Sequence, residues 1–299
     1  MDGLPRIIAR AATSEHMLRM AQQVAPSNAD VLIEGEQGTG KRLLARWIHR
    51  WSTRSGLPIT EVDCEACTEP ELESILFGGT ERFGSTGSPR LPQTGTLLLT
   101  EVGELPQRFQ ARLLCALDEH ERQDSRSKSP RVRVIATTGR PLRDLVAEKT
   151  FRGDLYYRLK VVPITVPALR VRREDIPVLA EQFLDVYSIS PVALTAQFVD
   201  GLLRHSWPGN VSELCNLMRR TAALCSTAEV GPEYLQFDEA APLPLLPGIS
   251  WRQAERQLLE ATLAATQGNR TRAAEKLGLS VRTVRNKIRD FGLPPRGTA

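Results

Sequence analysis

Cysteine and histidine are scarce in this chain, which has five cysteines and four histidines among its 299 residues. Only Cys64 and Cys67 are closely spaced, and neither a second cysteine pair nor a nearby histidine completes a zinc-binding pattern. The odd number of cysteines favours reduced thiols, with a redox pair at Cys64-x-x-Cys67 as the alternative. Long apolar runs and a signal-peptide pattern are also missing. We therefore expect a cytoplasmic protein with no zinc site and no membrane partner.

Acidic side chains are almost missing from the end of the chain. Between residues 268 and 299, eight Lys or Arg residues are opposed only by Glu275 and Asp290, so this segment carries a net charge of +6. The whole chain carries only +4, so the rest is slightly acidic. The overall charge is too small to indicate a partner, but a basic segment of this kind is typical of nucleic-acid binding.

A glycine-rich motif follows an apolar run near the N-terminus. Val31-Leu32-Ile33 leads into Gly35-Glu36-Gln37-Gly38-Thr39-Gly40-Lys41, and an amphipathic helix is expected from Arg42 onward. A strand, a glycine turn and a helix in this order are the context in which G-x-x-x-x-G-K binds phosphates, through inward-facing N–H groups and the lysine. The residues predicted to bind the nucleotide are Gly35, Gly38, Thr39, Gly40, Lys41 and Arg42. An ordinary strand-to-helix turn is the alternative, and Arg42 replaces the usual magnesium-holding Ser or Thr.

Strands alternate with helices after this loop. Further strands are expected at residues 59–62, 96–99, 132–137 and 161–166, and helices at 5–28, 69–76 and 107–119. Residues 77–94 are expected to form a loop, 174–230 to be wholly helical, and 239–248 to be a proline-rich linker. This alternation predicts an α/β fold with a parallel sheet that helices cover on both faces.

The basic C-terminal segment has the pattern of a helix-turn-helix. Helices are expected at residues 251–266 and 271–277, followed by a turn at Gly278 and a third helix capped by Ser280. Val281, Val284 and Ile288 share one face of that third helix. The polar residues expected to face base edges are Arg282, Thr283, Arg285, Asn286 and Arg289, and those expected on phosphates are Arg270, Arg272 and Lys287. A solvated basic tail is the alternative.

Five motifs of the chain occur together, in the same order, in one known family. They are Gly35–Lys41, Gly103–Pro106, Phe151–Leu159, Arg172–Pro177 and Trp207–Val211. Residues 5 to about 235 thereby resemble the AAA+ domain of bacterial enhancer-binding proteins, which activate sigma-54 RNA polymerase, and the C-terminal segment is similar to the family's Fis-type reader.

The resemblance implies an AAA+ P-loop core at residues 1–170, a helical lid at 171–237, a linker at 238–249 and an all-α helix-turn-helix domain at 250–299. It leaves no room for the upstream receiver domain of many members, so the input signal is expected to come from elsewhere.

The resemblance also implies roles in ATP hydrolysis. Glu101 corresponds to the glutamate that positions water, while Arg152 and Arg158 correspond to arginines that reach a neighbouring subunit. The implied cofactor is ATP or ADP. Magnesium would accompany it, but its usual carboxylate ligand is replaced by Thr100.

Other positions of the reaction depart from the family pattern as well. Gly139 replaces a polar residue, usually Asn, and Ser212 replaces the arginine that senses bound nucleotide. Asp63 stands where the family has an asparagine that restrains the glutamate. These departures predict nucleotide binding with poor hydrolysis; compensation through Asp63 or Glu104 is the alternative.

The loop with which this family contacts sigma-54 is altered too. Its GAFTGA motif aligns with Phe83-Gly84-Ser85-Thr86-Gly87-Ser88, so the central phenylalanine becomes Ser85. The residues assigned to this contact are Phe83, Gly84, Ser85, Thr86 and Gly87.

The sequence thus predicts a transcriptional regulator that binds double-stranded DNA and nucleotide, with impaired hydrolysis. It is expected to form dimers, with hexamers and mixed assemblies with a paralogue as further options. One alternative is an active ATPase that remodels sigma-54 RNA polymerase; another is a P-loop enzyme acting on a small substrate.

Overall fold

The computed structural model describes residues 4–77, 94–124, 132–188, 191–225 and 227–237, together with single positions between 259 and 291. The chain divides into two compact units, residues 1–237 and 238–299, and each has its own buried cluster. Within the described ranges, none of the helices combines the length and apolarity that crossing a membrane requires.

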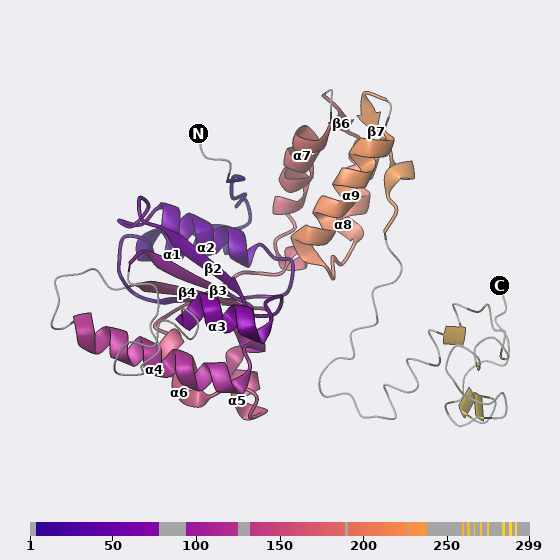
Figure 1. The fold of residues 1–299 in the computed structure, drawn as a ribbon. Coiled ribbons are helices and arrows are strands. Elements are labelled where there is room, and N and C mark those ends of the chain that lie inside the picture. The colour runs from indigo at the N-terminus through magenta and orange to yellow at the C-terminus, as the bar shows by residue number, and fades with distance from the viewer. Residues whose placement is uncertain are drawn as a thin grey trace. The chain divides into compact units, whose positions relative to one another are not determined.

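A five-stranded parallel sheet forms the centre of the first unit (Figure 1). Its strands are β1 (Val31–Glu34), β2 (Ile59–Asp63), β3 (Thr96–Thr100), β4 (Arg133–Thr138) and β5 (Val162–Thr165). They lie in the order β2-β3-β4-β1-β5. The predicted parallel α/β sheet is therefore confirmed.

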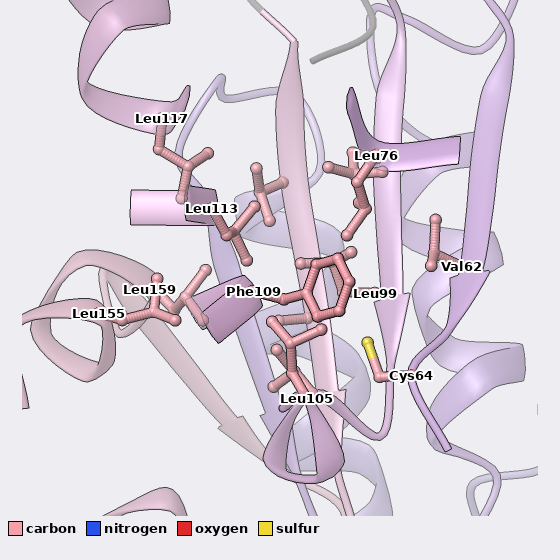
Figure 2. Packing of buried hydrophobic residues seen from close by; sticks show 14 of the residues in the cluster. Val62, Cys64, Leu76, Leu99, Leu105, Phe109, Leu113, Leu117, Leu155 and Leu159 are labelled. Atoms are coloured by element: carbon pink, nitrogen blue, oxygen red, sulfur yellow. The ribbon is translucent and has the colours of Figure 1, made fainter. Parts of the chain in front are cut away.

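Helices cover both faces of this sheet (Figure 1). One face packs against α1 (Ala12–Val24) and α2 (Lys41–Arg50). The other packs against α3 (Glu69–Phe77), α4 (Gln107–Asp124), α5 (Leu142–Ala147) and α6 (Gly153–Leu159). Figure 2 shows this second cluster, in which Phe109 of α4 lies among leucines of β3, α4 and α6. Alternate strand residues enter opposite clusters, which explains the uniformly apolar run of β3.

The predicted helix over residues 5–28 is shorter than expected. It begins at Ala12, because the buried Asp175 carboxylate accepts the N–H groups of Arg10 and Ala11 and the Ser14 hydroxyl, fixing the preceding chain in an extended form. It ends at Val24, where the guanidinium of Arg133 binds the Val24 carbonyl oxygen.

A helical lid follows the sheet. We define the lid as η3 (Leu169–Val171), α7 (Asp175–Tyr187), α8 (Ala196–Arg204), α9 (Asn210–Leu224) and η4 (Pro232–Tyr234), which surround the buried Trp207 and Phe198. The expectation that residues 174–230 are wholly helical is wrong, because β6 (Ala193–Leu194) and β7 (Glu229–Val230) form a short parallel pair.

In the second unit, Val284 and Ile288 are buried against Leu259 and Ala274. Two members of the apolar face expected on the third helix thus lie in a common core. Val281, Gly278 and Ser280 lie outside the described residues.

Candidate nucleotide-binding site

The glycine-rich loop connects β1 to α2 in a conformation that only glycine adopts without strain. Gly38 and Gly40 have φ of 76° and 101°, in the left-handed region. A Cβ at Gly38 would collide with the Gly209 carbonyl oxygen, and one at Gly35 would lie 2.6 Å from the Val166 oxygen. The loop is therefore packed closely on both sides, with backbone N–H groups at the start of α2 that suit an anion.

Lys41 and Glu101 meet at the carboxyl end of the sheet. The Lys41 Nζ atom lies 3.1 Å from Glu101 Oε1 and donates to the Glu36 carbonyl oxygen at 3.1 Å. The other oxygen of Glu101 accepts the N–H of Gly139 at 2.6 Å. The lysine and the glutamate to which the sequence assigned separate roles are thus brought into direct contact.

Two other predicted loop residues make contacts within the protein. Thr39 is buried, and its hydroxyl donates to the Glu36 carbonyl oxygen at 2.8 Å, which shapes the turn. Arg42 binds the carboxylate of Glu61 on β2, which Arg46 also binds. These hydrogen bonds, foremost that of Arg46, lower the pKa of Glu61. The Arg42 side chain is therefore engaged by β2 rather than by the phosphate loop.

The lid holds the loop from the opposite side. Arg170 forms a two-pronged ion pair with Glu36, which lowers the pKa of that carboxyl. Asn210 donates to Glu36 Oε2 and to the Gln37 carbonyl oxygen, and Arg172 donates to the Thr39 carbonyl oxygen at 2.7 Å. Sequence reasoning missed this clamp, because its contacts join residues 133 to 174 positions apart in the chain. In the structure, Trp207 and Asn210 have positive φ and form a tight turn beside the loop.

A cavity of about 460 Å³ lies between the loop and the lid, a size suited to a nucleotide. Its apolar lining includes Ile7, Ile8 and Leu179, and its polar lining includes Ser212 and Arg219 on α9. Arg6 and Arg172 also line it, whereas no Asp or Glu of the described chain does. A cavity with cationic but not anionic side chains favours a ligand that carries phosphates.

The other positions that the sequence linked to hydrolysis make contacts within the protein. Thr100 is buried, and its hydroxyl donates to the Val62 carbonyl oxygen. Gly139 offers only its backbone N–H to Glu101. Ser212 donates its backbone N–H to the Gly38 carbonyl oxygen at 3.2 Å, so Ser212 directly adjoins the loop.

The two arginines predicted to act on a neighbouring subunit differ in exposure. The Arg158 side chain is 16% exposed, and its guanidinium lies 3.1 Å from the buried Asp30, which precedes β1 at the end of the sheet opposite the loop. Arg152 is 48% exposed and paired only with the nearby Asp154 among the described residues. Arg152 is thus the more accessible of the two.

Most of the remaining predicted site residues are not among those that the structure describes. Phe83, Gly84, Ser85, Thr86 and Gly87 lie outside the described residues, as do Arg272, Arg282, Arg285, Asn286 and Arg289. Arg270, Thr283 and Lys287 are described, and each is partly exposed.

Comparison with known proteins assigns all three parts of the chain. Residues 7–165 match the sigma-54 interaction domain, 170–241 the AAA+ ATPase lid domain, and 250–291 the bacterial regulatory protein of the Fis family.

Curated relatives match over almost the whole chain. The transcriptional regulatory protein FlbD of Caulobacter vibrioides is 36% identical, covering 99% of this chain and 73% of its own length. ZraR of Escherichia coli K12 is 39% identical, covering 94% and 68%.

Among solved structures, NtrX of Brucella abortus in complex with ADP is 30% identical, with a TM-score of 0.67 over 98% of this chain and 70% of NtrX. The same protein in complex with ATP gives a TM-score of 0.66. This chain therefore belongs to the family of sigma-54-dependent enhancer-binding transcriptional regulators.

Proposed function

We propose that this protein is a DNA-bound transcriptional regulator whose AAA+ domain holds ATP or ADP as a ligand and hydrolyses ATP poorly. The observation that carries this proposal is the difference between the phosphate-binding residues and the surroundings of Glu101. Lys41 and the glycine loop are in place, but Glu101 is bound by Lys41 and by a bare backbone N–H at Gly139. A Cβ at Gly139 would lie 3.0 Å from Glu101 Oε2, so the side chain that the family carries there would shift the glutamate.

The expected loss of rate follows from transition-state stabilisation. Removing one preorganised charge or donor from such a site costs about two to three powers of ten in rate. Thr100 lacks the negative charge of the family's aspartate, and Ser212 lacks the positive charge of its arginine. Nucleotide binding depends instead on the backbone of the loop and on Lys41.

An active ATPase that remodels sigma-54 RNA polymerase is the second candidate. The direct contact of Lys41 with Glu101 favours it, because it brings together the lysine and the glutamate that the resemblance assigns to the reaction. The replacement of the loop phenylalanine by Ser85 argues against productive contact with sigma-54.

Assembly into dimers, with hexamers or mixed rings beyond them, belongs to the same proposal. Arg152 is exposed at the start of α6 and can complete the site of a neighbouring subunit, including that of an intact paralogue. In such a mixed ring, this chain would contribute an arginine to hydrolysis without hydrolysing ATP itself.

Nucleotide binding is tested by titrating ATP and ADP into the wild type and Lys41→Ala. We expect the variant to lose most of its affinity, because Lys41 supplies the buried positive charge of the loop. Equal affinity of both proteins would contradict nucleotide binding at this loop.

DNA binding is tested with Arg285→Ala on the best duplex found by selection. Loss of a bidentate contact to a base edge should cost about 1–3 kcal/mol and relax specificity. Lys287→Ala, expected on a phosphate, should instead weaken all sequences alike and reduce the salt dependence. Unchanged binding by Arg285→Ala would remove Arg285 from the readout.

A further inference from the structure

Two neighbouring strands carry complementary departures from the family pattern. On β3, Thr100 stands where the family has the aspartate that holds magnesium, and on β2, Asp63 stands where it has a neutral asparagine. We propose that Asp63 has taken over the role of the missing aspartate and anchors the magnesium ion that accompanies the nucleotide. This inference rests on the proposed nucleotide binding and extends it to the metal.

The register of the sheet places the two positions side by side. Asp63 and Thr100 are paired Cα partners of the parallel strands β2 and β3, and the Cys64 N–H continues the ladder to the Thr100 carbonyl oxygen at 2.9 Å. Paired residues on neighbouring strands point to the same face, about 4.8 Å apart. Compared with the family pattern, the carboxylate therefore lies on β2 instead of β3, at the same position relative to the carboxyl edge of the sheet.

The face on which Asp63 lies is that of the phosphate loop. Figure 2 shows Val62 and Cys64 pointing into the cluster with Phe109, on the face that α3 to α6 cover. Because successive strand residues alternate, Asp63 lies on the opposite face, against which α2 packs.

A contact between α2 and β2 brings this face close to the loop. Arg42, in the first turn of α2, binds Glu61, two residues before Asp63 on the same face of β2. Asp63 lies one step further toward the carboxyl edge, and Glu101, which follows its strand partner Thr100, contacts Lys41.

Of the two oxygens of the Asp63 carboxylate, one accepts hydrogen bonds from the described residues and the other does not. Its Oδ1 atom accepts the N–H groups of Glu65 and Ala66, each at 3.2 Å. Its Oδ2 atom makes no hydrogen bond or ion pair with any residue that the structure describes. Glu101, by contrast, has both oxygens occupied, by Lys41 and by Gly139. Asp63 thus keeps one carboxylate oxygen available for a cation.

One carboxylate suffices for a metal that arrives on a nucleotide. Magnesium keeps several waters and is usually bound through one or two carboxylates plus the phosphates of the substrate. The described residues hold no group of three or more metal-ligating side chains. The neutral hydroxyl of Thr100 beside Asp63 can contact a water of the metal shell.

The test compares ATP affinity in magnesium and in EDTA by calorimetry. We expect magnesium to tighten ATP binding by the wild type about tenfold, and Asp63→Asn to lose this gain while keeping its affinity in EDTA. The asparagine oxygen can still accept the two N–H groups, so the turn is preserved. Glu65→Gln, which removes an exposed carboxylate two residues away, is the matched control and should keep the gain.

The reciprocal exchange makes the test specific. The double variant Asp63→Asn/Thr100→Asp returns the carboxylate to β3 and should recover the magnesium gain. Mn²⁺ in place of magnesium gives a direct readout, since its paramagnetic resonance signal should report bound metal with ATP in the wild type and the double variant, but not in Asp63→Asn.

Two outcomes would overturn the inference. A full magnesium gain in Asp63→Asn would show that Asp63 does not hold the metal, and a wild type that binds ATP equally in magnesium and EDTA would leave nucleotide binding intact but remove the metal site. Failure of the wild type to bind ATP in either buffer would contradict the proposed nucleotide binding itself, and the metal site with it.

Discussion

The two halves of the nucleotide site have diverged in different ways. The half that holds phosphates keeps its glycines and Lys41 and is clamped by lid residues such as Asn210 and Arg172. The half proposed to cleave them carries neutral side chains, Thr100 and Ser212, where the resemblance implies charged ones. Binding relies on backbone geometry, which close packing of the loop preserves, whereas hydrolysis relies on individual side chains. The comparison teaches that close backbone packing can preserve the form of a P-loop while the side chains around it vary.

The largest effect on the binding half is expected from Gly38→Ala. The added Cβ meets the Gly209 carbonyl oxygen at a position whose φ is 76°, so the loop and the lid must separate. Strain of this kind should lower ATP affinity by about a hundredfold. Gly56→Ala, whose Cβ would meet no atom within 4 Å, is the control. If both variants bound ATP like the wild type, the close fit of loop and lid would be irrelevant to binding.

A smaller effect is expected from loosening the clamp with Arg170→Ala. The ion pair of Arg170 with Glu36 is partly exposed, so its loss should lower ATP affinity only about two- to fivefold. Arg173→Ala removes an exposed arginine from the same segment and serves as the control. Equal affinities for the two variants would mean that the Arg170 contact does not support the loop.

Which parts of the fold could be predicted from the sequence depended on particular residues. The strands and the loop were predictable, because Val31–Ile33 is apolar and a glycine turn follows directly. Helices α5 and α6 were missed, because six or seven residues show too little periodicity. The β6/β7 pair was missed because each strand has only two residues.

Long-range pairing limited the prediction of the site. Arg158 was identified from a local motif, but its partner Asp30 lies 128 residues away, so its internal engagement was not visible in the sequence. The alignment of Asp63 with Thr100 likewise depends on sheet register, which spacing along the chain does not reveal.

The smallest effect concerns the side chain of Arg42, which was assigned to the cofactor but binds Glu61. The folded-state pKa of Glu61 is lowered, so its contribution to stability is present above the ordinary value of 4.5 and is lost as the pH falls through the folded pKa. Glu61→Gln should therefore lower the free energy of unfolding at pH 7 by about 0.5–1 kcal/mol, and this difference should shrink below pH 4.5 and disappear once the pH is below the lowered folded pKa. Urea unfolding across pH would measure it, with Glu65→Gln as control. A difference that is constant with pH would rule out this ion pair as its source.

The central claim is that the protein binds ATP but hydrolyses it poorly. Steady-state ATP turnover, measured at concentrations that permit ring assembly, tests this claim most directly. The account predicts that the wild type binds ATP but turns it over far more slowly than about one per second, and that Gly139→Asn/Ser212→Arg raises the rate at least about tenfold. Wild-type turnover near one per second that Glu101→Gln abolishes would contradict the account and establish an active motor.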